Sequence, residues 1–542
     1  MKTVTFLIPF LFGISSVKAQ EGHQPGNTPN IQFSTDQVIQ NKASEDQRNL
    51  RMASAYNGWL YAAYTINNTT TGVGGIYVSV SKDNGESWKK FVTYQFGSSF
   101  YSLTDVVIGG RDSTHLNVFI AGVLQNTANN TSTLYIDDFD GRTGSLLAGQ
   151  VYHRSLGSLT VTDLSMACDY LFPAHGSAPF GVGLLYTLHG GASDSLLFTS
   201  SQNGGQTFAA VKPISTTQSF YRKISLAYGR SPSVIGGAYF AAWELLGSSV
   251  ANAGHIYTAH CSSLNQTSWI NPVCIDSLDA NAVNQSCHPS ISVQQSNSDN
   301  DQLDLSAMIV FESMPGGNQQ NKNISCVFNK GAYSNGGWIS FPVISTAEND
   351  MQPFTAFNPF TNLFMLTYLD STDGKLPLLT QDMNLGKPGS WSTVTTQYND
   401  QTSQLGAANP RIAVNIWLQQ PTFIWITELP GTSHGVAMFD AAYSGLATGI
   451  VSGATNTFML GTPFPNPSSG SIQIPITNDH SQPVWMEVYD MLGNTVREKQ
   501  ETELTPGNQL LTVDASKWNT GVYFCRLTTN EHSQTYRLVV QH

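Results

Sequence analysis

Two aspartates stand at the head of short apolar runs in the first third of the chain. They are Asp105, in Asp105-Val106-Val107-Ile108, and Asp163, in Asp163-Leu164-Ser165-Met166-Ala167. Glycoside hydrolysis uses two carboxyl groups, about 5–5.5 Å apart for retention of configuration or about 6.5–9.5 Å apart for inversion. We interpret Asp105 and Asp163 as a candidate catalytic pair if neighbouring elements bring them together. The alternative is that each aspartate caps a strand end and holds ordered water.

The apolar run with a polar leading residue is a repeat. It recurs every 56 to 67 residues, and an aromatic-rich run and two further short strands follow each copy. Four short strands with turns between them are typical of one blade of a β-propeller. The sequence therefore predicts an all-β chain with a seven-bladed propeller. The seven leading residues are Asn49, Asp105, Asp163, Tyr221, His288, Gln352 and Asn409.

The innermost strands of a propeller line a central channel, so these leading residues are expected to form a polar ring at its mouth. Such a ring can hydrogen-bond sugar hydroxyls, or it can simply hold water. Three arginines in the same runs add positive charge. The candidate ligand-binding residues are Asn49, Arg51, Tyr221, Arg222, His288, Gln352, Asn409 and Arg411.

An eight-residue motif, Ser81-Lys82-Asp83-Asn84-Gly85-Glu86-Ser87-Trp88, lies between two predicted strands of the first repeat. A weaker copy runs from Ser201 to Phe208. An Asp or Asn side chain in such a turn accepts hydrogen bonds from backbone amides, and glycine takes a positive φ without strain. We expect a structural role, with the final aromatic packed between blades, for Ser81, Asp83, Gly85, Trp88, Ser201, Asn203, Gly205 and Phe208.

This motif fits the Asp-box (BNR) pattern S-x-D-x-G-x-[ST]-W, and residues 49–457 resemble the sialidase-like Asp-box propellers. The resemblance implies a β-propeller whose Asp-boxes lie on the outer rim, away from any active site. Catalysis is not implied. Arg51-Met52-Ala53 occupies the place of the sialidase R-I-P signature but lacks the proline, and seven repeats replace the six blades of sialidases.

The chain changes character after residue 457, where a Pro-rich entry leads into short strands with period-two alternation. About seven such strands predict a small immunoglobulin-like β-sandwich over residues 458–542. Three motifs, Pro465-Asn466-Pro467, Val488-Tyr489-Asp490-Met491-Leu492-Gly493 and Gly521-Val522-Tyr523-Phe524, resemble the type A sorting domain of type IX secretion cargo. The resemblance implies a Bacteroidetes-type bacterium, a type IX secretion machinery as partner, and a mature protein that is secreted or attached to the outer surface.

Residues 1–19 have the features of a signal peptide: Lys2, a short apolar run, and Val17-Lys18-Ala19 before the cleavage site. Residues 20–48 precede the first repeat, and Ile31 to Ile39 are expected to close the propeller by adding a strand to the last blade. This closure would cover an exposed sheet edge. No later segment has the 18 apolar residues of a transmembrane span.

Charge excludes another class of partner. The chain has a net charge of −12, and only 11% of its residues are charged. Nucleic-acid binding requires basic patches that neutralise phosphates, so we do not expect it.

Six cysteines are present, and Cys261 with Cys274 is the disulfide that the predicted hairpin favours; burial of several as reduced thiols is the alternative. The sequence lacks CxxC and HExxH spacings, so neither a metal nor a cofactor is expected. The favoured function is a secreted or cell-surface propeller that binds a glycan or a surface protein, without catalysis. The alternative is a secreted carbohydrate-active enzyme, a glycoside hydrolase or lyase that uses carboxylates at the channel mouth.

Overall fold

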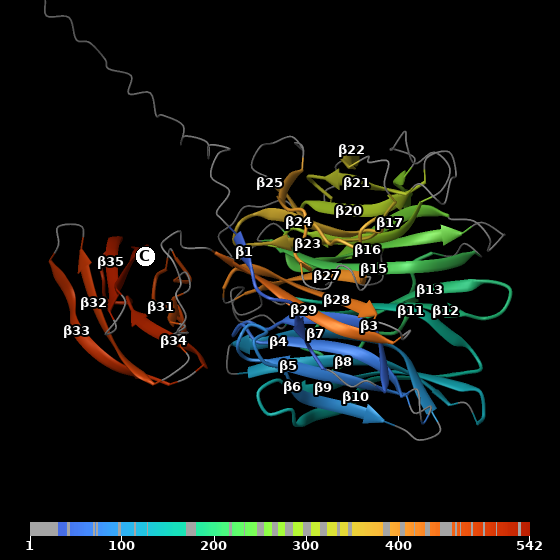
Figure 1. Cartoon of the computed structure of the whole chain (residues 1–542), viewed down its shortest axis with the longest axis horizontal. Helices are drawn as coiled ribbons and strands as arrows, with labels where there is room; N and C mark the ends of the chain where they lie inside the picture. The colour runs from blue at the N-terminus through green and yellow to red at the C-terminus, as the bar shows by residue number, and fades with distance from the viewer. Residues whose placement is uncertain are drawn as a thin grey trace, which may run out of the picture.

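The computed structural model describes residues 31–541 apart from gaps, the longer of which are 170–179, 247–253, 263–268, 277–285, 296–304, 315–321, 383–390, 401–406 and 445–457. The predicted signal peptide lies outside the described residues. Every regular element among those described is a β-strand, which confirms the all-β class (Figure 1). The described part of the chain contains no helix with the length and apolar character of a membrane span.

The first three sheets of the described chain each hold four antiparallel strands that pair in chain order. The first sheet comprises β3 (Glu45–Ser54), β4 (Leu60–Asn68), β5 (Gly74–Ser81) and β6 (Lys89–Gln95). The second comprises β7 (Ser99–Asp112), β8 (His115–Asn126), β9 (Thr131–Asp140) and β10 (Leu146–Gly157). The third comprises β11 (Thr160–Cys168), β12 (Val182–His189), β13 (Asp194–Ser201) and β14 (Lys212–Pro213).

The next three sheets repeat this antiparallel pattern. The fourth comprises β15 (Phe220–Ser231), β16 (Val234–Leu246), β17 (His255–Ser262) and β18 (Val273–Cys274). The fifth comprises β19 (Ser286–Val293), β20 (Ala307–Ser313), β21 (Asn323–Asn329) and β22 (Ile339–Ile344). The sixth comprises β23 (Asp350–Asn358), β24 (Leu363–Asp370), β25 (Leu378–Asp382) and β26 (Ser392–Thr395).

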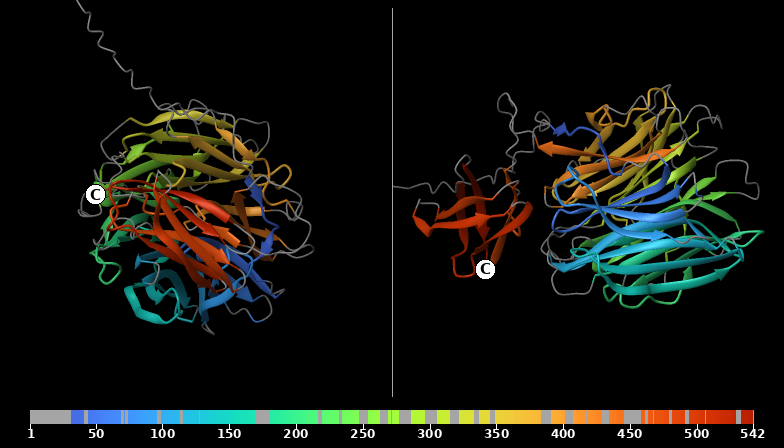
Figure 2. Two further views of the ribbon diagram at one scale, coloured as in Figure 1. Left: turned by 90° about the vertical axis from the view of Figure 1, so that its left-hand side faces the viewer. Right: turned by 60° about the horizontal axis from the view of Figure 1, so that its bottom comes forward.

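The seventh sheet combines the two ends of this region. Its strands are β27 (Ala407–Asn415), β28 (Gln420–Glu428) and β29 (Gly435–Ser444), and the N-terminal strands β1 (Ile31–Phe33) and β2 (Gln37–Val38) both pair antiparallel with β29. The inner strands β3, β7, β11, β15, β19, β23 and β27 each contact the next, and β27 contacts β3. The sheets therefore close into a ring, a β-propeller (Figures 1 and 2).

The core lies in the seams between neighbouring sheets. Tyr61 and Val118, for example, belong to one buried cluster between the first and second sheets, and Leu60 and Phe439 belong to another between the first and seventh. Because both faces of each sheet are covered, a middle strand such as β5 is buried along its whole length. Burial on both faces explains why these strands read as continuous apolar runs rather than alternating ones.

The C-terminal region forms a separate body beside the ring, with its own apolar core (Figures 1 and 2). One sheet has the order β30-β31-β34 and the other β33-β32-β35-β36. Tyr56 of the propeller packs edge-on against Phe464, with ring centroids 5.6 Å apart. The strands are β30 (Phe458–Leu460), β31 (Ser471–Asn478), β32 (Gln482–Asp490), β33 (Thr495–Leu504), β34 (Gly507–Asp514), β35 (Gly521–Thr528) and β36 (Ser533–Val540).

Candidate functional site at the channel mouth

A β-bulge lies near the start of each inner strand. The register with the second strand shifts between Arg48 and Arg51 in β3, and a comparable shift occurs in β7, β11, β15, β19, β23 and β27. A bulge places one extra residue against its partner strand and re-aims the side chains beside it. Five of the bulge residues have positive φ, namely Asn49, Lys223, His288, Gln352 and Asn409.

Positive φ has a conformational cost for residues other than glycine, and Lys, His and Gln tolerate it less well than Asn. The bulges are therefore maintained by the surrounding structure. Four of the five positive-φ residues, Asn49, His288, Gln352 and Asn409, are predicted leading residues. Asp105 and Asp163 follow the bulge of their strand, and Tyr221 precedes it.

The inner strands enclose a cavity of about 660 Å³ along the ring axis. Of the ten candidate site residues, nine line it: Asn49, Arg51, Asp105, Asp163, Arg222, His288, Gln352, Asn409 and Arg411. Further along the same strands the lining becomes apolar, as at Ile108, Leu226 and Val414. The charged positions thus gather at the mouth where the inner strands begin.

Tyr221 is the exception among the candidate ligand-binding residues. Its side chain is fully buried in the seam between the third and fourth sheets, and its backbone N–H donates to Asp194 Oδ2 over 3.0 Å. In β15 the bulge follows Arg222, so Arg222 and Lys223 take the channel positions. The prediction for Tyr221 is wrong because the position of the bulge decides which side chain faces the channel.

The two candidate catalytic aspartates join neighbouring sheets. Asp105 accepts N–H bonds from Val106 (2.8 Å) and from Met166 of the third sheet (2.7 Å). Asp163 accepts N–H bonds from Leu164 (2.9 Å) and from Ile224 of the fourth sheet (3.0 Å). Each carboxylate therefore uses both oxygens to link its own inner strand to the next one.

Other inner strands make the same link with uncharged acceptors. Ser225 Oγ accepts from Ile291 N–H over 3.2 Å, and Ser290 Oγ accepts from Thr355 N–H over 3.1 Å. Gln352 Oε1 accepts from Asn409 N–H over 2.6 Å. Aspartate is thus one of several residue types whose side chain accepts a backbone N–H bond from the next inner strand of this ring.

Arg51 and Arg411 lie on the same side of the mouth as the two aspartates. Arg51 Nε is 3.9 Å from Asp105 Oδ1. The Arg411 guanidinium stacks over the Phe354 ring at 4.7 Å, and its buried Nε has no hydrogen-bond partner in the described structure. Burial and the neighbouring Arg51 lower the pKa of Arg411 to about 9, so it remains charged at neutral pH. Burial raises the pKa of Asp105, and Arg51 opposes that shift.

The opposite side of the mouth contains a network centred on Glu312, which sequence analysis missed. Lys322 Nζ donates to Glu312 Oε2 over 2.8 Å, His288 Nδ1 lies 2.9 Å from Oε1, and Gln352 N–H donates to Oε1 over 2.8 Å. Burial alone would raise the pKa of Glu312, but the hydrogen bonds and charges of His288 and Lys322 lower it to about 2. The buried carboxylate is therefore ionised and fully paired.

Glu244, the other carboxylate that sequence analysis missed, pairs across strands with Arg222. Burial raises the pKa of Glu244, and the charges of His288, Arg222 and Lys223 oppose the shift. Glu244 and Glu312 come from second strands, β16 and β20. The two glutamates could have been located only from the register of the second strand with the bulged inner strand, and that register cannot be read from the sequence.

The two eight-residue turns have the same geometry. Ser81 Oγ donates to Asp83 Oδ1 over 2.8 Å, and Ser87 N–H donates to the same oxygen over 2.9 Å; Asn203 Oδ1 accepts the equivalent bonds from Ser201 and Thr207. Gly85 has φ +94°, and a Cβ there would meet the Phe439 ring at 1.8 Å. These turns lie against the preceding sheet, and none of their residues lines the channel.

The cysteines do not form the predicted pair. No disulfide joins any of the six, all of which are described. The register of β17 and β18 places Cys274 opposite Tyr257, four residues from Cys261, so the Cys261–Cys274 prediction is wrong. Among the described residues, two groups of His, Cys and acidic side chains bring their ligand atoms within 4.8 Å of one another, namely His255, Cys274 and Asp276, and Cys287, His288 and Glu312.

Comparisons with known proteins bear on both regions. The chain resembles solved structures at low similarity, and the three described here align over about three quarters of it. An α-L-arabinofuranosidase of Fusarium graminearum shows 9% identity and a TM-score of 0.42, covering 76% of this chain and 98% of its own. An α-L-arabinanase of Penicillium chrysogenum shows 12% and 0.40, covering 76% and 98%. The NanB sialidase of Streptococcus pneumoniae shows 10% and 0.39, covering 75% and 70%. No curated protein matches the sequence.

The C-terminal body gives the one family match. Residues 462–541 match the model of the secretion system C-terminal sorting domain. This range covers the two C-terminal sheets apart from β30. The chain thus carries a type IX secretion sorting domain, and the protein is secreted or attached to the outer cell surface.

Proposed function

We propose that this protein is an exported surface propeller that binds an anionic glycan at the mouth of its central channel. The observation that carries the proposal is the charge of the lining. Among the residues that the structure describes, four permanent cations line the cavity, Arg51, Arg222, Lys223 and Arg411, against the two carboxylates Asp105 and Asp163. This excess of positive charge occurs in a chain whose net charge is −12.

The cations are also more available than the acids. Both oxygens of Asp105 and of Asp163 accept backbone N–H bonds. Arg222 and Lys223 are exposed, and Arg411 Nε has no partner in the described structure. A guanidinium forms strong bidentate hydrogen bonds with carboxylate and sulfate-like groups. A uronate or sulfated sugar supplies such a group, and the side-chain amides of Asn49, Gln352 and Asn409 in the same lining are of a type that hydrogen-bonds neutral hydroxyls.

The alternative function, a glycoside hydrolase or lyase, requires a carboxyl group that can exchange a proton with substrate. Both oxygens of Asp105 and of Asp163 already accept backbone N–H bonds, which favours a structural role for the two aspartates. Binding without turnover therefore has the better support.

We also propose a domain organisation and an export route for this chain. We infer a seven-bladed propeller of the Asp-box type over residues 49–457, closed by strands from residues 20–48, and an immunoglobulin-like sorting domain over residues 458–542. Residues 1–19 direct export to the periplasm, and the type IX machinery is the partner of the C-terminal domain. Pairing of β1 and β2 with β29 supports the closure.

A glycan array tests the proposal directly. The chain from residue 20 to residue 542 is applied to neutral, uronic-acid-containing and sulfated glycans, and the mass of each spot is read afterwards. We expect retention on acidic glycans with unchanged masses. Loss of mass from particular spots would establish the hydrolase or lyase alternative instead, and retention on neutral glycans alone would contradict the charge argument.

A further inference from the structure

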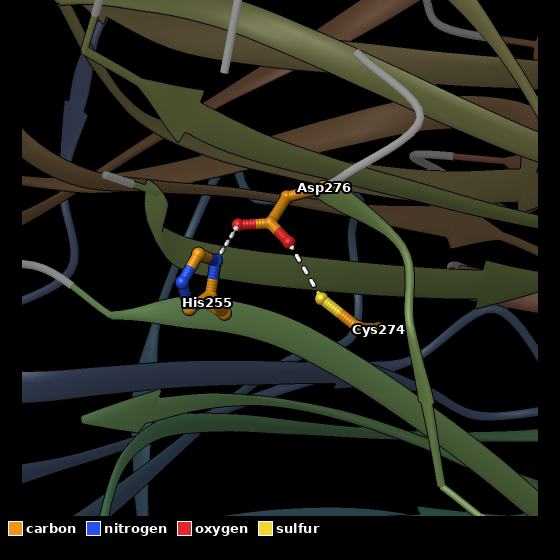
Figure 3. A group of neighbouring side chains, drawn as sticks. All are labelled: His255, Cys274 and Asp276. Carbon is orange, nitrogen blue, oxygen red and sulfur yellow. Dashed lines mark hydrogen bonds and ion pairs between the residues drawn. The ribbon is translucent and has the colours of Figure 1, made fainter. Parts of the chain in front are cut away.

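We propose that the outer edge of the fourth sheet contains a zinc-type metal site formed by His255, Cys274 and Asp276. The three side chains face one another (Figure 3). They lie at the open end of the β17–β18 hairpin, opposite its turn, because His255 begins β17 and Asp276 follows β18. His255 Nδ1 lies 3.1 Å from Asp276 Oδ2, and Cys274 Sγ lies 3.0 Å from Asp276 Oδ1.

The backbone register explains why these residues meet although 19 positions separate His255 from Cys274. Tyr257 pairs with Cys274, and Ile275 N–H donates to the Ile256 carbonyl over 2.9 Å. Continuing this antiparallel register by one position places His255 opposite Asp276. Side chains two residues apart in a strand share a face, so Cys274 and Asp276 lie together on the face that His255 occupies.

The donor set suits a borderline-soft divalent ion. Zinc binds imidazole nitrogen and carboxylate oxygen at about 2.0–2.2 Å and thiolate sulfur at about 2.3 Å in tetrahedral geometry. Such bonds hold ligand atoms roughly 3.3–3.8 Å apart, and the three donor atoms here already lie within 4.8 Å of one another. A small adjustment of side-chain torsions is enough to close the site around an ion.

Charge and exposure favour the same conclusion. The Asp276 side chain is completely buried, and among the described residues its ion-pair partner is His255, whose side chain is 56% exposed. Binding of Zn²⁺ would release the thiol proton of Cys274 to solvent and leave one thiolate, one carboxylate, one neutral imidazole and one dication. The complex is therefore neutral, as a buried carboxylate requires.

The second group of similar composition provides a contrast. Glu312 lies near Cys287 and His288, but Lys322 Nζ already lies 2.8 Å from its carboxylate. The ammonium group supplies the positive charge that an ion would otherwise supply, so a cation there would have to displace Lys322. We therefore assign the metal site to the fourth sheet and not to the fifth.

Zinc and cobalt binding to the exported full chain tests this assignment. The protein is purified with a phosphine reductant, loaded with zinc, dialysed, and analysed for bound metal; cobalt loading reports a thiolate ligand through its near-ultraviolet charge-transfer absorption. We expect one zinc per chain and a cobalt–thiolate band. His255→Ala and Cys274→Ser should each weaken zinc binding by at least about tenfold and abolish the band.

His189→Ala is the matched control. His189 and Asp194 form a pair 2.6 Å apart on the third sheet with similar exposure, and neither belongs to a metal-ligand group among the described residues. This variant should bind zinc as the wild type does. Absence of zinc from the reduced wild-type protein would overturn the assignment, and so would undiminished binding by His255→Ala, whose exposed side chain can be removed without unfolding.

Discussion

The two sides of the channel mouth use the same residue types in different ways. On one side Arg51 and Arg411 lie beside aspartates whose oxygens already accept backbone N–H bonds, and Arg411 Nε has no partner in the described structure. On the other side Glu312 is surrounded by His288, Lys322 and a backbone amide. We infer that a charged cluster at this mouth can bind a ligand only where its charges are not already paired within the protein.

The Glu312 side should therefore matter most for stability. Glu312→Gln is expected to lower the free energy of unfolding by about 3 kcal/mol at pH 7, because the pKa of Glu312 falls from 4.5 to about 2 on folding. A carboxyl with a lowered folded-state pKa stabilises the protein above its unfolded pKa. Urea denaturation of the wild type should show this contribution disappearing as the pH falls from 4.5 towards 2, and the variant should lack that acid-sensitive component.

Glu428→Gln is the control for this variant. Glu428 is exposed and lies 3.9 Å from Arg48. Exposed ion pairs contribute about 0–1 kcal/mol, so its replacement should leave the urea midpoint nearly unchanged. Equal effects of the two substitutions would remove the distinction between the two sides of the mouth.

The arginine side should matter most for binding. Arg411→Ala is expected to weaken binding of an acidic oligosaccharide by about 10- to 100-fold, or about 1.4–2.8 kcal/mol, with little change in the melting temperature. Isothermal titration calorimetry measures the binding constant. Arg48→Ala, which removes an arginine of the same strand as Arg51 but outside the channel lining, should bind as the wild type does. Equal loss in both variants would indicate a non-specific charge effect.

The aspartates should show the smaller, purely structural effect. Asp105→Asn retains one acceptor oxygen and loses the other, so one of the two amide bonds at 2.7 and 2.8 Å is lost. We expect the free energy of unfolding to fall by about 1–2 kcal/mol and glycan affinity to stay within a few-fold. An unchanged stability together with loss of glycan turnover would instead restore Asp105 to a catalytic role.

The sequence reveals the inner strands because their period of about sixty residues and their polar leading positions are local patterns. Each predicted leading residue lies within the inner strand assigned to it, from Asn49 in β3 to Asn409 in β27. Secretion can also be predicted from the sequence, since each motif of the C-terminal domain is a contiguous run of residues. The family match confirms the sorting domain.

What the sequence conceals depends on register. Tyr221 was assigned to the channel because the position of a bulge cannot be read from residue types, and a shift of one residue moves a side chain to the other face. Glu244, Glu312 and the His255–Asp276 pair depend on which residues face each other across strands. These contacts join positions 21 to 25 residues apart, and they become visible only when the sheets are assembled.

Anion recognition at the channel mouth can be tested with one polysaccharide in two charge states. Oligogalacturonate and the same oligosaccharide with its carboxyl groups reduced to alcohols are titrated into residues 20–542 at low and at high salt. We expect the acidic form to bind, its binding to weaken as salt screens the four channel cations, and the reduced form to bind far more weakly. Equal affinity for both forms, independent of salt, would contradict anion recognition at the channel mouth.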